Sequence, residues 1–69
     1  MTPAQRLSTA REIDPGATDK TDAVFGHLIK CADAATASRV ADLLRARGET
    51  RTWYSPRINQ DRVFFDIKG

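Results

Sequence analysis

The clearest hydrophobic periodicity in the chain covers residues 33–47. Apolar side chains recur there at the i, i+3, i+4 and i+7 positions that form one face of an amphipathic helix. Asp33 is a suitable N-cap residue, and Gly48 fits the left-handed position that follows a last helical turn. The pattern therefore predicts a helix whose buried face is formed by Ala34, Ala37, Val40, Ala41 and Leu44, with Leu43 widening it.

A short apolar run before this helix predicts a strand. Residues 23–31 (AVFGHLIKC) include β-branched and aromatic residues, and the run has the length of a strand. A strand that is apolar on both faces is typical of the interior of a sheet. In a regular strand, one face carries Phe25, His27, Ile29 and Cys31, and the other carries Val24, Leu28 and Lys30.

Two more strands are predicted after the helix. Residues 49–55 (ETRTWYS) alternate and are rich in threonine and aromatic residues, which favour strands. Residues 62–68 (RVFFDIK) alternate more regularly and are the clearest strand in the chain. The polar residues 59–61 between them predict a turn, and the two segments would therefore form an antiparallel hairpin.

The predicted order of strand, helix, strand, strand indicates a small α+β domain of βαββ type, equivalent to half of a ferredoxin-like fold. A right-handed crossover through the helix would make the first two strands parallel. The hairpin would place the third strand in the middle, which gives the strand order 1-3-2. The helix would cover one face of the sheet and meet Val63, Phe65 and Ile67 there. The other face would stay open, with Phe64 on its central strand as a candidate binding surface.

The N-terminal part of the chain carries few apolar side chains, which predicts a flexible arm. The residues TPAQ, beginning at Thr2, have the arrangement of a capping box, and a short helix over residues 1–14 would follow. Its apolar stripe is thin, and short isolated helices are marginal in water. Residues 15–22 (PGATDKTD) have the composition of a linker. The expected organisation is an arm over residues 1–22, made of a short helix and a linker, and a βαββ domain over residues 23–69.

The chain has 69 residues, with one cysteine and one histidine. A domain of this size buries a small core, and proteins of similar length gain stability from disulfides, metals or oligomerisation. Cys31 has no partner for an internal disulfide, and together with His27 it is too little for a structural zinc site. The composition therefore predicts no metal and no cofactor. It favours self-association as a homodimer, or docking on a larger partner.

No residue pattern in the chain indicates a catalytic centre. Along a strand, His27 and Cys31 would lie about 13 Å apart, too far to act as base and nucleophile. Carboxylates in the predicted arm and helix are solvated or have helix roles, and Asp66, on the predicted open face, would neutralise its basic neighbours Arg62 and Lys68. The chain also lacks the glycine-rich phosphate loops and the serine-nucleophile motif. We therefore expect neither enzymatic activity nor a small-molecule substrate.

Arginine and aromatic residues gather in the predicted hairpin and are the strongest candidates for a binding site. They are Arg51, Trp53, Tyr54, Arg57, Arg62 and Phe64. Such side chains are enriched at protein interfaces, and they also stack on bases and hold phosphates. The first interpretation is a non-catalytic module that binds a protein partner or its own copy. The alternatives are a nucleic-acid-binding module and a purely structural role, with Trp53 in the core and Arg51 its solvated neighbour.

The formal net charge is +2, from 11 basic and 9 acidic residues. This excess is smaller than that of a dedicated nucleic-acid-binding domain. No apolar window of about 20 residues predicts a membrane helix, and the N-terminal residues lack the apolar core of a secretory signal. The expected location is the cytoplasm, with a free thiol. The small size also fits accessory or inhibitor proteins of phages and mobile elements, which act by occupying the surface of a host machine.

Between Phe25 and Ile67 the chain resembles SPOR-type domains, which are small modules that bind peptidoglycan. The resemblance consists of a strand, the alanine-rich helix ADAATASRVADLLRARG and two further strands. It implies a role in the cell envelope. No export or membrane segment accompanies it in the sequence, so we do not assign the family.

Overall fold

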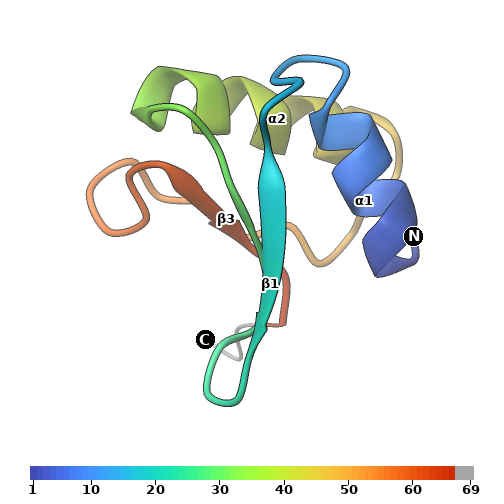
Figure 1. Cartoon of the computed structure of the whole chain (residues 1–69), viewed down its shortest axis with the longest axis vertical. Coiled ribbons are helices and arrows are strands. Elements are labelled where there is room, and N and C mark those ends of the chain that lie inside the picture. Colours follow the sequence, from blue (N-terminus) through green and yellow to red (C-terminus); the bar gives the residue numbers. More distant parts are fainter. Residues whose placement is uncertain (67–69) are drawn as a thin grey trace.

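A computed structural model describes residues 1–66, which form two helices and a three-stranded antiparallel sheet (Figure 1). The α+β class predicted from the sequence is confirmed. In the sheet, β2 lies between β1 and β3; α2 contacts the sheet, and α1 lies against α2. In chain order the elements are α1 (Pro3–Ala10), β1 (Thr18–Asp22), β2 (Gly26–Lys30), α2 (Ala34–Ala46) and β3 (Arg62–Phe64).

The helix predicted from the periodicity of residues 33–47 is α2. Asp33 is its N-cap and accepts a hydrogen bond from the backbone N–H of Thr36 at 2.8 Å. Gly48 follows the last turn with a φ of +93°, the left-handed conformation that glycine adopts without steric cost. The buried residues of α2 are Ala37, Val40, Ala41 and Leu44, as the apolar spacing predicts. Ala34, predicted for the same face, is exposed because it lies in the first turn of the helix, and Leu43 is half-buried.

The core lies between α2 and one face of the sheet. Ile29 of β2 and Val63 of β3 are fully buried there, and Phe65 joins the same cluster just after β3. The predicted meeting of Val63 and Phe65 with the helix stripe is therefore found. Ile67, predicted for the same face, lies outside the described residues, as does the predicted continuation of this strand to Lys68.

Helix α1 begins with the capping box predicted at Thr2. The Thr2 hydroxyl accepts the backbone N–H of Gln5 at 3.2 Å, and the Gln5 side-chain oxygen accepts the backbone N–H of Thr2 at 2.8 Å. Ala10 at the end of α1 is buried in the main core cluster, and Leu7 packs against that cluster. The structure therefore shows α1 as part of the packed fold and not as a detached arm. The predicted domain boundary after residue 22 stays a prediction, because it concerns whether residues 23–69 fold on their own.

The linker predicted over residues 15–22 is corrected by the structure, because it contains β1. This strand pairs antiparallel with β2 along its whole length. Its side chains are almost all exposed, so no apolar alternation marks it in the sequence. Backbone hydrogen bonds to β2 hold it instead, together with a turn in which Asp22 Oδ1 accepts the backbone N–H groups of Val24 and Phe25 at 2.7 and 3.1 Å.

The predicted βαββ arrangement with strand order 1-3-2 is not confirmed as a whole, because β1 is an additional strand beside β2 and residues 49–55 do not form a full strand. The predicted neighbours of β3 are found in part, since β3 lies between β2 and the bridge at Trp53 and is antiparallel to both. The sheet order is β1-β2-β3, and both neighbouring pairs are antiparallel. Residues 49–55, predicted as a full strand, contribute one bridge, in which Trp53 exchanges backbone hydrogen bonds of 2.8 and 3.1 Å with Phe64. Glu49 at the start of this segment turns inward to Arg6 at 2.7 Å. The chain therefore meets β3 only at Trp53.

Candidate binding face

The sheet face that points away from α2, which we call the open face, carries an apolar row at its centre. The register places Lys20 of β1 opposite Leu28 of β2, and Leu28 opposite Phe64 of β3. Trp53 extends the row beyond Phe64 through its bridge. Residues that oppose each other on neighbouring strands project to the same face. Leu28 and Phe64 therefore form the centre of a row that ends in Trp53 on one side and Lys20 on the other.

Phe25, in the turn between β1 and β2, widens this row into an aromatic cluster. The ring centroids of Phe25 and Phe64 are 5.6 Å apart, and those of Trp53 and Phe64 are 6.2 Å apart. Both distances are in the range of favourable aromatic pairs. Phe25 nevertheless stays 48% exposed as a residue. The cluster is therefore held together internally and still presents ring surface to solvent.

The turn that carries Phe25 is stabilised by the carboxylate of Asp22. Hydrogen bonds from the backbone N–H groups of Val24 and Phe25 favour the ionised form and lower the pKa of the Asp22 carboxyl below its ordinary value. Gly26 at the start of β2 has a φ of +73°, and a Cβ there would lie 3.1 Å from the side chain of Asp66. Asp66 itself pairs with Arg51 at 3.1 Å. This end of the open face is therefore tightly packed, and its carboxylates have partners.

A second row of the open face, one pleat away, is basic. Thr18 lies opposite Lys30, and Lys30 lies opposite Arg62. The closest carboxylate to Arg62 is that of Asp61 at 3.9 Å, at the outer limit of an ion pair. Among residues 1–66, neither Lys20 nor Lys30 forms an ion pair. Three exposed cations, Lys20, Lys30 and Arg62, therefore lie at or beside the apolar row.

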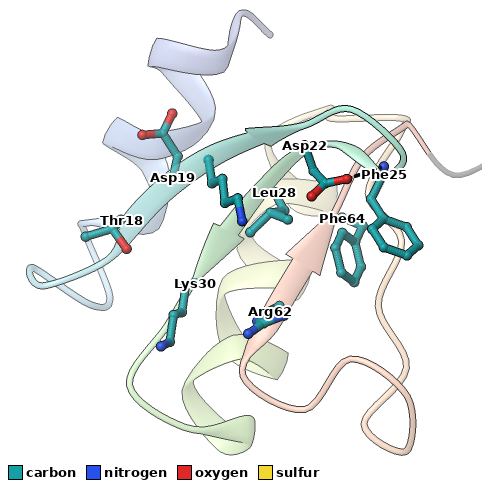
Figure 2. A pocket seen from close by; sticks show the side chains of 9 residues that line it. Thr18, Asp19, Asp22, Phe25, Leu28, Lys30, Arg62 and Phe64 are labelled. Carbon is teal, nitrogen blue, oxygen red and sulfur yellow. Dashed lines mark hydrogen bonds between the residues drawn. The ribbon is translucent and has the colours of Figure 1, made fainter.

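The open face is hollowed between these two rows, as Figure 2 shows. The hollow has a volume of about 460 Å³. Leu28 and Phe64 form its apolar floor, Phe25 stands at one end, and Lys30 and Arg62 lie at the other (Figure 2). The residues that line it are Thr18, Asp19, Lys20, Asp22, Phe25, Leu28, Lys30, Arg62 and Phe64.

Three of the six predicted binding residues come together on the open face, namely Trp53, Arg62 and Phe64. Arg51 lies beside the same edge, where its guanidinium is paired with Asp66. Arg57 is exposed in the turns that precede β3 and belongs to neither row.

Tyr54, the remaining predicted residue, has a structural role. Its hydroxyl lies 2.9 Å from the carbonyl oxygen of Ala34 and 2.7 Å from that of Gln60. It therefore ties the first turn of α2 to the loop before β3, and it packs against the core cluster. Desolvation raises the pKa of this hydroxyl, so it stays protonated and can donate at neutral pH.

Two residues of the open face, Lys20 and Phe25, are not among the predicted site residues. Lys20 lies in the segment predicted as a linker, and only the pairing of β1 with β2 brings it beside Leu28. A regular strand from residue 23 predicts Phe25 on the strand face opposite to Leu28, and the structure corrects this placement. The strand begins at Gly26, and the turn before it carries Phe25 round to Phe64. The positive φ of Gly26 is the local signal for that turn.

A buried polar network occupies the opposite side of the sheet, between α1 and the segment after α2. Arg6 donates from Nε and Nη2 to Glu49 Oε1 at 3.0 and 2.7 Å, and the guanidinium lies 4.3 Å from the ring centroid of Phe65. The Met1 ammonium reaches Glu49 Oε2 at 3.2 Å. Burial alone would raise the pKa of Glu49, but the hydrogen bonds from Arg6 and the ammonium outweigh it, and the pKa is lowered.

His27 joins this network through both ring nitrogens. Arg6 Nη1 lies 3.3 Å from His27 Nδ1, and Asp19 Oδ2 lies 3.0 Å from Nε2. Because a guanidinium can only donate, Nδ1 accepts and Nε2 carries the hydrogen toward Asp19. Figure 2 shows the Asp19 carboxylate turned away from the basic row. His27 therefore does not line the hollow, and Asp19, which does, directs its carboxylate to His27.

Cys31 is buried as a member of the core cluster. Desolvation, with smaller contributions from the charges of Asp14, Asp61 and Asp33, raises the pKa of its thiol to about 11. The thiol is therefore protonated at neutral pH, and a protonated buried thiol is a poor nucleophile. Within residues 1–66, no group of three or more His, Cys, Asp or Glu side chains is arranged to hold a metal ion.

Neither helix of the described part of the chain is long and apolar enough to cross a membrane. In comparisons with known proteins, no protein-family model, curated protein or solved structure matches this chain significantly.

Proposed function

We propose that this chain is a non-catalytic interaction module that binds a macromolecular partner through the open face of its sheet. The observation that carries the proposal is the apolar row of Leu28, Phe64 and Trp53 on the sheet face away from α2. Leu28 is buried there, and Phe25, which packs on Phe64, stays 48% exposed. Aromatic side chains in a hollow with a polar rim are typical of interface anchors. The proposed mechanism is occupancy: the module acts by covering a surface of its partner.

Two classes of partner fit this proposal. A protein partner, or a second copy of the chain as a homodimer, would bury Phe25 and Phe64 and remove their contact with water. Nucleic acid is the second candidate. The observation that favours it is the basic row of Lys30 and Arg62, with Lys20 beside it.

The absence of catalysis is part of the same proposal. The thiol of Cys31 is buried and protonated, and the imidazole of His27 has both nitrogens engaged inside the fold. Neither group lines the hollow on the open face. A cytoplasmic location also remains a proposal.

Site-specific photo-cross-linking tests whether the open face is the binding surface. A benzoylphenylalanine at Phe25 would report on the hollow, and the same probe at Arg39, on the exposed side of α2, is the matched control. Irradiation of the purified protein at micromolar concentration tests for adducts with a second copy. Irradiation in an extract of the source cells tests for adducts with other proteins or with nuclease-sensitive material. We expect adducts at position 25 that the control position does not form. Equal or no labelling at the two positions would overturn the proposal.

A further inference from the structure

We infer that the occupant of the open face is single-stranded nucleic acid, with bases on the aromatic cluster of Phe25, Phe64 and Trp53 and phosphates on the basic row. This inference rests on the proposed function, because it names the partner of the same face. The first argument is the balance of charge. Lys20, Lys30 and Arg62 line the hollow as three cations. Two carboxylates also line it, and both are hydrogen-bonded within the fold: Asp19 to His27, and Asp22 to the turn before β2.

The charge balance disfavours a second copy of this chain as the occupant. One oxygen of Asp22 already accepts two backbone N–H groups. Two open faces brought together would place three cations of one copy against three of the other, and the two carboxylates of each face already have hydrogen-bond partners within their own copy. Like charges opposed across an interface destabilise it. A polyanion meets the same face with the complementary sign.

The placement of aromatic and basic groups indicates the kind of polyanion. Phe64 lies between Phe25 and Trp53, and this cluster exposes ring surface on which a base can stack. Lys30 and Arg62 oppose each other on neighbouring strands, and this pair lies two residues, or about 7 Å along the strands, from the pair of Leu28 and Phe64. A nucleic-acid backbone that runs along the basic row can therefore place its bases over the aromatic cluster.

A single strand fits this arrangement better than a duplex. The bases of a duplex are stacked on each other, and their faces cannot reach a protein ring without being flipped out. The hollow, with its apolar floor of Leu28 and Phe64, has room for an unstacked base. Three cations also match one short stretch of backbone rather than the wide charged surface of a duplex.

The test is fluorescence anisotropy of the full chain with labelled twelve-residue probes: dT, rU and a DNA duplex of the same length. We expect both single strands to bind about tenfold or more tightly than the duplex. Because one cation releases about 0.7 counterion from a single strand, three phosphate contacts predict a slope of about −2 for log K against log salt. The dT and rU arms show whether the strand is DNA or RNA.

Two double variants of equal charge separate the open face from general electrostatics. Lys20→Gln/Lys30→Gln removes two cations of the hollow, and Arg39→Gln/Arg45→Gln removes two exposed cations of α2. We expect the first variant to lose about tenfold in affinity or more, and the second to lose much less. Phe25→Ser removes a stacking ring that is half exposed, and the loss expected is about fivefold or more. Thermal melting of each variant confirms that it is folded.

Each outcome bears on the inference. Absence of single-strand binding at low salt, equal loss in both double variants, or equal binding of poly-glutamate would overturn it. In any of these cases, a protein or second-copy adduct at position 25 in the cross-linking experiment would leave the interaction module standing with a different partner. Failure of both experiments would overturn the inference and the proposed function together.

Discussion

Arg6 and Glu49 form an ion pair across 43 positions of the sequence, and the pair is almost completely buried. Arg6 belongs to α1, and Glu49 begins the segment that leads from α2 to the bridge with β3. The guanidinium also packs on Phe65 and contacts His27. The pair therefore connects the N-terminal helix to the sheet, and it places the segment that delivers Trp53 to the open face.

Replacing Arg6 by methionine should destabilise the fold by about 3 kcal/mol, because it leaves the Glu49 carboxylate buried without its main partner. Urea unfolding followed by circular dichroism measures the change. Adding Glu49→Leu to Arg6→Met should recover part of the loss, since the remaining buried charge is then removed. Arg47→Met, which breaks the exposed pair with Glu12, is the control and should have a much smaller effect. Equal losses for Arg6→Met and Arg47→Met would contradict the structural role of the buried pair.

The stability of the fold should fall as the pH is lowered below about 4.5, the ordinary pKa of a glutamate. The pKa of Glu49 is lower in the folded state than in the unfolded state. Its contribution is therefore complete above the unfolded pKa and is lost as the pH falls through the folded pKa. Urea unfolding between pH 7 and pH 3 measures this dependence. Glu49→Gln should be less stable at neutral pH and should show a shallower decline; a decline as steep as that of the parent protein would contradict the assignment.

Leu44→Ala should cost about 2–5 kcal/mol of unfolding free energy, because it removes a fully buried side chain and leaves a cavity between α2 and the sheet. For a domain of this size, that is a large part of the total stability. Leu43→Ala, on the half-buried flank of the same helix, is the matched control and should cost less. Urea unfolding gives the midpoints of the two variants, and the midpoints are compared at an equal dependence of the unfolding free energy on urea concentration. A loss below about 1 kcal/mol for Leu44→Ala would show that this helix face is not the core.

The thiol of Cys31 should react slowly with a disulfide reagent at pH 8 in the folded protein. Its pKa of about 11 leaves little thiolate at that pH, and its burial restricts access. Reaction in urea should be fast, because unfolding removes both restrictions. Cys31→Ser/Ala35→Cys, which moves the thiol to an exposed position of α2, is the control and should react quickly in the folded state. Equal rates for the folded parent and this control would contradict the burial of Cys31.

The sequence by itself determined the parts of the fold that depend on nearby residues. The spacing of Ala37, Val40 and Leu44 identified α2 and its buried face, because helical neighbours are three or four residues apart. The capping box at Thr2 located the start of α1, since its two hydrogen bonds join residues three apart. The alternation of Val63, Phe64 and Phe65 separated the core face from the open face, because the side chains of an extended chain alternate.

Tertiary structure alone decided the features that join distant segments. The polar residues of β1 carry no strand signal, and they form a strand because β2 offers unpaired backbone groups beside them. The burial of Arg6 depends on its pairing with Glu49, which lies 43 positions later in the chain. The open face itself draws Lys20 from β1 and Arg62 from β3. Backbone pairing and long-range ion pairs depend on which segments meet in space, and the residues on either side of a segment do not encode that.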